Sequence, residues 1–311
     1  MLDVRRMRVL REVALRGSFS AAADSLSFTQ SAVSQQIAAL EREAGAVLVE
    51  RSARGVRLTD AGKAVVRHAE GILARLAEAE SELEAIAGLR GGRLRTAAFE
   101  SVAETIMPVA VAQFAQQHPG VELSMAMMEP EDSLVALRAG EIDLAVTVGS
   151  GAPGDRDGEG VQHHHLLEDP MYLVLPQRHP LARKRGLRLA DVADEPWIGG
   201  EPNCECNRMI IDACNRHGFH PRIAFETDDY GAQQGFIAAG VGVSLLPDLA
   251  LISVRDDVVI RSLGAKPPFR RILAGTLKDG FCAPATQAML EILVDVCAEF
   301  AGKRKTLALA S

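Results

Sequence analysis

The sequence contains few cysteines, few aromatic residues and no long hydrophobic run. All five cysteines of the 311 residues lie beyond position 200. An odd number gathered in one region does not resemble the paired framework of a disulfide-rich secreted domain. No apolar run is long enough to predict a membrane-spanning helix. The charged start, with Arg5 and Arg6, lacks the apolar core of a signal peptide, so we expect a cytoplasmic protein.

Motifs of enzyme chemistry are absent as well. We find no Ser-His-Asp constellation, no zinc-protease helix and no phosphate loop, so we do not expect an enzyme. The chain is long enough for two or three domains, with 48% hydrophobic and 24% charged residues. Residues 1–95 carry 15 basic and 12 acidic residues, whereas the remainder carries 19 and 29. A basic head on an acidic body is expected when only one end contacts phosphates.

The first sixty residues have the apolar spacing of three short helices. The first helix ends at Gly17, and the second is alanine-rich with Ser20 as its expected N-cap. Thr29 or Ser31 is the expected N-cap of the third helix, which runs to about residue 43. Residues 47–58 then predict a two-stranded wing that carries arginines for phosphates.

The third helix has a polar but uncharged outer face. Gln30, Ser34, Gln35 and Gln36 lie opposite its apolar stripe. Such side chains can donate and accept hydrogen bonds at base edges in the major groove, which favours a recognition helix. The alternative is a small three-helix domain with a solvated polar face.

These residues carry a family resemblance. Residues 19–26, 29–37 and 40–41 closely resemble the helix-turn-helix signature of the LysR-type transcriptional regulators, and 48–62 is similar to that family's wing and the start of its linker helix. Val49 departs from the family's usual Phe, and Ser31 stands where many members have Pro. The resemblance implies double-stranded DNA as a partner. The candidate DNA-binding residues are Thr29, Gln30, Ser31, Ser34 and Gln35 for the bases, with Arg51 and Arg54 for the backbone or minor groove.

Residues 59–90 are predicted to form a long linker helix with Thr59 as a possible N-cap. A heptad seam of apolar residues favours pairing with a second copy, which would place two recognition helices over a pseudo-palindromic operator. The alternative is that this helix packs on the C-terminal domain. LysR-type regulators use a similar helix to dimerise and often form tetramers, and an activator would also contact RNA polymerase. The seam consists of Val65, Ala69, Ile72, Leu76, Ala79, Leu83 and Ile86.

Strands alternate with helices over residues 91–311, after the winged helix-turn-helix of 1–58 and the linker. This alternation predicts an α/β domain whose mostly parallel sheet forms two lobes, about 93–165 with 266–301 and about 166–265. The expected strands are 94–98, 121–127, 144–148, 171–175, 223–225, 241–246 and 270–277. The expected helices are 103–117, 131–139, 206–216, 230–239 and 286–300.

A cleft between the lobes is the expected place for a ligand, because helix N-termini point there. The backbone N–H groups and dipoles of the helices near Ser101, an expected N-cap, and near Asn203 and Cys204 would favour a carboxylate or similar anion. Alternatively, Ser101 and Asn203 only cap helices. The effector that we expect is small and either anionic or aromatic. Residues 140–145, 195–198 and 239–247 also resemble the LysR-type effector domain, which is similar in fold to periplasmic binding proteins. This resemblance implies that Ser101, Glu129, Thr147, Asn203 and Val241 lie along the cleft or its hinge. The candidate effector-binding residues are Ser101, Glu129, Thr147, Asn203 and Val241, together with Val102 and Cys204.

Three further motifs are better explained without a cofactor or a metal, and we expect neither. Residues 149–154 have the spacing G-x-G-x-x-G but lack the helix that must follow. The run 163–165 is three histidines, of which at most two share one side of an extended segment. Cys204, Cys206 and Cys214 lie along one helix, whose dipole could lower a thiol pKa at its start. Thiol or metal sensing therefore stays as an alternative to core packing.

Two other functional classes fit the sequence less well than a regulator does. A solute-binding protein for transport would have no use for residues 1–90. An enzyme fused to a DNA-binding head would need a catalytic constellation in residues 93–311, which we do not find. We therefore expect a regulator in which ligand binding between the lobes changes the packing of dimers and the spacing or bend imposed on DNA.

Overall fold

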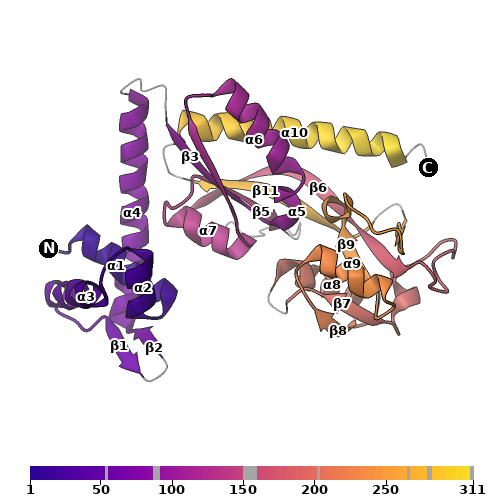
Figure 1. Ribbon diagram of the computed structural model, residues 1–311, viewed down its shortest axis with the longest axis horizontal. Helices are drawn as coiled ribbons and strands as arrows, with labels where there is room; N and C mark the ends of the chain where they lie inside the picture. Colours follow the sequence, from indigo (N-terminus) through magenta and orange to yellow (C-terminus); the bar gives the residue numbers. More distant parts are fainter. Residues whose placement is uncertain are drawn as a thin grey trace.

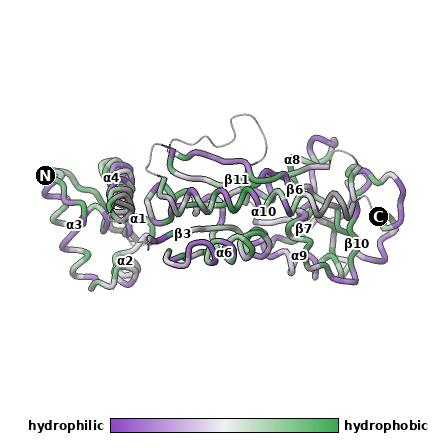
Figure 2. The backbone as a smooth tube through the Cα atoms, turned by 90° about the horizontal axis from the view of Figure 1, so that it is seen from above, coloured by the Kyte–Doolittle hydropathy of each residue, from purple (hydrophilic) through white to green (hydrophobic). Residues whose placement is uncertain are grey.

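The computed structural model describes residues 1–52, 55–86, 92–149, 160–201, 204–264, 267–278 and 282–308. A head of three helices and a two-stranded wing lies at one end, and a long helix connects it to a domain built on a seven-stranded sheet (Figure 1). Seen from above, the molecule is elongated, with the head and the end of the C-terminal helix near opposite ends (Figure 2). Among the described residues, no helix is both long and apolar enough to cross a membrane.

Capping residues set the limits of the helices in the head. Thr29 caps the third helix, as one of the two expected candidates, and Gly17 ends the first in the left-handed conformation with φ of 64°. The expected cap of the second helix, Ser20, is wrong: Ser18 caps it, because only a residue that precedes the helix can direct its hydroxyl at the first turn. The helices are α1 Val4–Arg16, α2 Phe19–Ser25 and α3 Gln30–Ala44.

The wing completes the apolar core of the head. Strand β1, Val49–Ser52, pairs antiparallel with β2, Gly55–Leu58. Val49 is 9% exposed and packs with the helices, so the smaller side chain still belongs to the core. The turn at 53–54 lies outside the described residues.

Helix α4, Asp60–Ile86, begins where the sequence predicts. The Thr59 hydroxyl accepts a hydrogen bond from the backbone N–H of Gly62 at 3.0 Å, and Ala69 is fully buried against the head. Beyond Ala69, the large apolar residues of the heptad seam that the structure describes are exposed to solvent. Ile72, Leu76 and Leu83 are 39%, 46% and 65% exposed.

The central sheet is mixed, not mostly parallel as expected. β3 runs parallel to β4 and β5, but β11 pairs antiparallel with β5 and β6, and β6 pairs antiparallel with β9 and β10. Strand–helix alternation does not reveal this, because the chain leaves the first lobe and returns as β11 in the opposite direction. The strands are β3 Arg93–Ala98, β4 Glu122–Met127, β5 Leu144–Gly149, β6 Val161–Pro176, β9 Ser244–Pro247, β10 Val258–Arg261 and β11 Phe269–Leu277.

Helices cover both faces of the sheet in the first lobe. α6, Ile106–Gln117, and α10, Pro284–Ala308, pack on one face, and α7, Pro130–Arg138, packs on the other (Figure 1). The expected helix over 103–117 corresponds to α6, which begins three residues later than expected, and a separate short helix, α5 (Glu100–Ala103), precedes it. The chain breaks at Thr105, whose hydroxyl donates to the Ser101 carbonyl at 2.6 Å.

The second lobe has a separate core around the fully buried Trp197. Strand β6 reaches both cores, since Leu167 lies in the first and Leu173 in the second. A continuous strand therefore joins the lobes, and two strands of this lobe, β7 and β10, were not among those expected. Its other elements are η1 Leu189–Val192, β7 Pro196–Gly199, α8 Glu205–Arg216, β8 Arg222–Glu226, α9 Tyr230–Ala238 and η2 Asp248–Leu251.

Candidate functional site

The outer face of α3 presents the side chains that we expected to meet DNA bases. Gln30, Ser31 and Gln35 are exposed, and Ser34 is half-buried. Thr29 differs, because its hydroxyl accepts a backbone hydrogen bond at 3.2 Å and lies 3.0 Å from Ser31 Oγ. The amides of Gln30 and Gln35 are therefore the groups on this face best suited to base edges.

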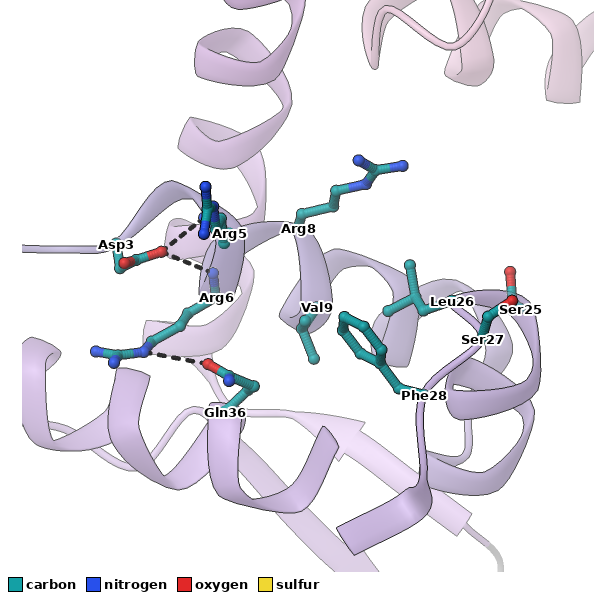
Figure 3. Close-up of a pocket in the computed structure, with 10 residues that line it drawn as sticks. All are labelled: Asp3, Arg5, Arg6, Arg8, Val9, Ser25, Leu26, Ser27, Phe28 and Gln36. Atoms are coloured by element: carbon teal, nitrogen blue, oxygen red, sulfur yellow. Dashed lines mark hydrogen bonds between the residues drawn. The ribbon is translucent and has the colours of Figure 1, made fainter. Parts of the chain in front are cut away.

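A second polar surface of the head lies beside α3. A cavity of about 650 Å³ opens between α1 and the α2–α3 turn, and Arg5 and Arg8 lie at its edge with exposed side chains (Figure 3). Arg6 is held there, since its Nε donates to Gln36 Oε1 at 3.2 Å. Phe28, 51% exposed, forms part of the wall. We did not include these arginines among the candidates, although the basic run at the N-terminus was the available signal.

The interface between the lobes is organised by one buried guanidinium. Arg270 on β11 is fully buried, and its Nε donates to Asp169 Oδ2 on β6 at 2.9 Å. Its Nη2 donates to Ser101 Oγ in the first lobe at 2.6 Å, and its Nη1 donates to Tyr230 Oη in the second at 3.2 Å. Cys206 Sγ lies 3.2 Å from the same hydroxyl and 3.6 Å from Nη1. These five residues, the Arg270 cluster, join α5 to α8 and α9.

An interlobe cavity adjoins the Arg270 cluster. Its volume is about 30 Å³, which leaves room for no more than a few water molecules between the lobes. Two of the expected effector-binding residues, Glu129 and Cys204, line it. The other polar groups of its wall are Glu100, Glu205, Cys206, Asp228, Tyr230 and Gln233.

The remaining expected residues lie outside this lining. Ser101 is fully buried inside α5, whose N-cap position is Phe99, so Ser101 does not cap that helix. Val102 is buried in the first core. The Thr147 hydroxyl is buried and has no hydrogen-bond partner among the described residues. Val241 is half-buried in the turn after α9.

Several predicted features lie outside the described residues. These are Arg54, Asn203, the side chain of Arg51 and residues 150–154 of the glycine motif. His163–His165 fall within β6 and pair with β11. Within the described ranges, no group of three or more His, Cys, Asp and Glu side chains is arranged to hold a metal ion.

Burial and neighbouring carboxylates raise the pKa of two glutamates that line the cavity. Partial burial, Asp229 and Glu104 raise the pKa of Glu100 to about 7. Partial burial and Asp228 raise the pKa of Glu129 in the same way. The cavity is therefore strongly electronegative, with part of its negative charge titrating near neutral pH.

A second ionic link crosses between the lobes. Arg208 on α8 contacts Glu205 of its own helix at 2.6 Å and Glu131 of α7 at 2.7 Å. This link is exposed, unlike the Arg270 cluster, because the Arg208 and Glu131 side chains are 44% and 58% accessible. We expect it to be weakened by salt, whereas the buried cluster is screened much less.

Burial raises the pKa of two cysteines of the second lobe. It raises the pKa of Cys204 to about 12, so a dipole-lowered thiol pKa is not found there. Cys214 is fully buried in the core, and its pKa is likewise raised to about 12. Core packing explains Cys214, whereas Cys206 belongs to the Arg270 cluster.

Sequence reasoning missed Arg270, Asp169 and Tyr230. The two charged residues lie directly opposite each other in the β6–β11 register, and both side chains are fully buried. A charge in a buried strand requires a partner, and this was the signal available. The partner could not be identified without the antiparallel pairing.

The head also contacts the first lobe directly. Arg11 of α1 is 6% exposed, and its Nη2 lies 2.6 Å from Glu141 Oε1. Its Nη1 donates to the Ala139 carbonyl, at the C-terminal end of α7, at 3.3 Å. Because Glu141 is itself 41% accessible, this junction is an ion pair at the edge of solvent.

Comparison with known proteins agrees with this architecture. Residues 4–63 match the family described as "Bacterial regulatory helix-turn-helix protein, lysR family", and residues 87–298 match "LysR substrate binding domain". The probable HTH-type transcriptional regulator LrrA of Synechococcus elongatus is 31% identical over 94% of this chain and 96% of its own length.

Solved structures of similar fold extend over almost the whole chain. A full-length OxyR variant from Pseudomonas aeruginosa has a TM-score of 0.69 at 23% identity, covering 96% of this chain and 95% of that one. Full-length CbnR complexed with its target DNA has a TM-score of 0.63 at 22% identity, covering 95% and 100%. The chain therefore belongs to the LysR family of DNA-binding transcriptional regulators with an effector-binding domain, and it is not an enzyme.

Proposed function

We propose that this protein is a cytoplasmic homodimer that recognises a pseudo-palindromic DNA sequence through α3. In this proposal Thr29, Gln30, Ser31, Ser34 and Gln35 face the bases, while Arg51 and Arg54 approach the backbone or minor groove. The observation that carries it is the exposed, uncharged polar face of α3 in a winged head. The head, linker and effector domain would then be residues 1–58, 59–90 and 91–311.

The exposed seam of α4 supports the dimer. Ile72, Leu76 and Leu83 are large apolar side chains that stay exposed within the described part of the chain. Burial against the same helix of a second copy would remove them from water and fix two heads on one axis.

Exposed apolar surfaces on both lobes support assembly beyond a dimer. Met127 of β4 is 69% exposed, and Phe225 and Phe236 of the second lobe stack with ring centroids 5.1 Å apart while 43% and 37% exposed. A second pair of copies would cover these surfaces and give the tetramer that we propose.

The effector is proposed to bind in the interlobe cavity. A volume of about 30 Å³ admits only a small group, so a larger ligand requires the lobes to separate. A ligand with different affinity for the two lobe arrangements would shift their populations, and thereby the geometry of paired heads on DNA. If this change activates transcription, RNA polymerase becomes a further partner.

A mobility-shift assay tests the DNA-binding part of the proposal. We expect the protein to shift DNA from beside its own gene, with affinity that falls steeply with salt. Gln35→Ala should weaken specific binding by about ten-fold or more, because a bidentate base contact contributes about 1–3 kcal/mol. Gln116→Ala on the exposed surface of α6 is the matched control. Equal operator affinity of the Gln35→Ala and Gln116→Ala proteins would refute the base contact.

A further inference from the structure

The start of α8 places two thiols on the wall of the interlobe cavity. Cys204 and Cys206 are both half-buried, and both line the cavity. Cys204 is the N-cap residue of α8, and its backbone is extended. Two residues this close in the chain have Cα atoms at most about 7 Å apart, and a disulfide spans up to about 7 Å. A disulfide between them therefore needs only a local change before the first turn of α8.

Two buried side chains direct hydrogen-bond donors at the Cys206 sulfur. Arg270 Nη1 donates to Sγ at 3.6 Å, and the Tyr230 hydroxyl lies 3.2 Å from it. Burial raises the pKa of Tyr230 well above its ordinary value of 10, so this hydroxyl keeps its proton. The Tyr230 oxygen already accepts from Arg270 Nη1, which leaves the hydroxyl proton for the sulfur. A cysteine beside a guanidinium is in the environment typical of a reactive thiol.

Cys204 has a different environment, which keeps its thiol protonated. Burial raises the pKa of Cys204 to about 12, and a hydrogen bond to Asp228 raises it further. Asp228 Oδ1 and Cys204 Sγ both lie against Gly200, where an added Cβ would collide with each of them. The Asp228 carboxylate is therefore placed to accept the thiol proton when Cys204 reacts.

The cavity limits which oxidants reach the Cys206 sulfur. Its volume of about 30 Å³ admits a molecule of only a few atoms. Glu100, Glu129 and Asp228 on its wall repel a negatively charged molecule but not an uncharged one. Hydrogen peroxide is small and uncharged. Cumene hydroperoxide is bulky, and glutathione disulfide is both bulky and negatively charged, so hydrogen peroxide fits this cavity best.

We propose that Cys206 and Cys204 are a peroxide-responsive thiol pair, whose oxidation to a disulfide releases α8 from the Arg270 cluster. The Cys206 sulfur attacks one oxygen of hydrogen peroxide, so that an S–O bond forms, the O–O bond breaks and water leaves with the thiol proton. The Cys204 sulfur then attacks the sulfenic acid, so that an S–S bond forms, the S–O bond breaks and a second water leaves with the Cys204 proton. The two thiols together lose two electrons, which reduce the peroxide.

Disulfide formation removes a contact from the Arg270 cluster. The sulfur of a disulfide is uncharged and a weak acceptor, so Cys206 no longer holds the donors of Tyr230 and Arg270. Because Arg270 also donates to Ser101 of the first lobe, this loss alters the contact between the lobes. The chemistry is independent of DNA, whereas its effect on regulation rests on the proposed function, in which the lobe arrangement controls the heads.

Mass spectrometry of the full-length protein tests the disulfide. Reduced protein is treated with an equimolar amount of hydrogen peroxide, and the remaining thiols are alkylated before tryptic digestion. Both cysteines lie in one tryptic peptide, residues 189–208, because no lysine or arginine occurs between Arg188 and Arg208. We expect this peptide to escape alkylation and to be lighter by two hydrogen atoms. A fully alkylated peptide, or a disulfide to Cys214 instead, would overturn the proposal.

Oxidant size tests the role of the cavity. Cumene hydroperoxide should leave most of the 189–208 peptide alkylated in the time that hydrogen peroxide needs to complete the reaction, with free cysteine as the reference for both oxidants. Equal relative rates for the two oxidants would show that the cavity does not select the peroxide.

The variant Cys204→Ser identifies the residue that reacts first. Without a second thiol, Cys206 stops at the sulfenic acid, which dimedone labels. We expect Cys206 to be labelled about ten-fold or more faster than the exposed Cys282 of the same molecule, because Cys206 lies beside a guanidinium. The matched variant Cys206→Ser should leave Cys204 unlabelled. Equal labelling of Cys206 and Cys282, or labelling of Cys204, would overturn the assignment.

The contribution of the tyrosine is tested in the Cys204→Ser background. Tyr230→Phe should slow dimedone labelling of Cys206 by about three-fold or more, because one hydrogen bond to the sulfur is lost. Tyr172→Phe makes the same change on β6, outside the cavity lining, and should label at the original rate. Melting temperatures verify that both variants are folded. Equal rates in the two variants would exclude Tyr230 as a positioning residue.

The two levels of proposal fail in different ways. A protein that shifts its operator DNA but keeps both thiols reduced in peroxide would refute only the thiol pair. A protein that forms the disulfide but shows no preference for the operator would refute the proposed function. The oxidised protein should give a different footprint on the operator from the reduced one, and an identical footprint would overturn the link from α8 to the lobes.

Discussion

At the scale of the residue, Arg270 and Asp169 show how a buried charge is accommodated. Both side chains are completely inaccessible, and they face each other across two neighbouring strands. Moving either charge out of water costs several kcal/mol, which only a good partner and further hydrogen bonds offset. Asp169 is the charged partner of Arg270. Its second carboxylate oxygen accepts a further hydrogen bond from the backbone N–H of Leu249 at 3.1 Å.

We predict that Asp169→Asn destabilises the protein strongly. The variant leaves Arg270 charged and buried without its counter-ion, at a cost of about 3–5 kcal/mol. For a chain of this size the melting temperature should fall by on the order of 10 °C in a thermal-unfolding measurement. Asp257→Asn removes the partner of the exposed Arg255 and should leave the melting temperature nearly unchanged. Equal effects of the two variants would contradict the role given to burial.

Glu100 should make stability depend on pH. Its pKa of about 7 in the folded protein lies above the ordinary 4.5, so the folded state binds more protons between these values. The contribution of Glu100 to stability therefore falls as the pH rises from about 4.5 through 7. The charges that face it are Asp229, Glu104 and Glu129.

The measurement is a comparison of melting temperatures with Glu100→Gln across pH. The variant should melt at a higher temperature than the unaltered protein at about pH 8, and the difference should vanish at about pH 4.5 and below. A constant difference over this range would show that the glutamate does not titrate as described.

At the scale of the element, local signals predicted the head better than the effector domain. The capping residues and terminal glycines of α1 and α3 lie next to the helices that they limit. The start and end of each helix can therefore be predicted from one short stretch of sequence. By contrast, Ser101, which lies in α5 just before the break between α5 and α6, accepts a hydrogen bond from Arg270, a residue 169 positions further along the chain. The direction of β11 depends equally on distant pairing.

The two candidate sites, the α3 face and the interlobe cavity, also differ in how well local sequence predicts them. The α3 face could be predicted because period and composition coincide within fifteen residues. The interlobe cavity could be located only roughly: Glu129 and Cys204 were named, whereas Glu100, Asp228 and Tyr230 were not. Their proximity results from tertiary packing of α5, α7 and α9, which no local pattern encodes.

The helix α4 leads to a test of self-association. We predict that Leu83→Asp, at a seam position that is 65% exposed, converts the dimer to monomer at micromolar concentration. Sedimentation equilibrium gives the mass. Arg67→Asp introduces the same carboxylate at an exposed position outside the seam and should leave the mass unchanged. A dimer that persists in Leu83→Asp would show that another surface holds the copies together.

At the scale of the whole molecule, the Arg11 junction connects the DNA-binding head to the first lobe. It joins the middle of α1 to the turn after α7, and the N-cap position of α7 is the cavity residue Glu129. A movement of α7 on ligand binding therefore has a direct route to the head.

We predict that Arg11→Ala loosens this junction without unfolding either part. Hydrogen exchange at Ala139–Glu141 should become faster, because the guanidinium that covers this turn is lost. Operator affinity without ligand should be retained, since α3 is untouched. Arg8→Ala, exposed on the same helix, is the control. Unchanged exchange in Arg11→Ala would exclude a connection through this arginine.

The engagement of Arg270 by three separate segments also has a kinetic consequence. Any separation of the lobes must break a hydrogen bond to Ser101 or to Tyr230 before solvent can replace it, and a buried N–H left bare costs about 1–3 kcal/mol. Intermediate degrees of opening are therefore the least stable, and the lobes should exchange between two discrete arrangements. Such a sensor responds to its ligand by changing how long each arrangement lasts, not by gradual widening.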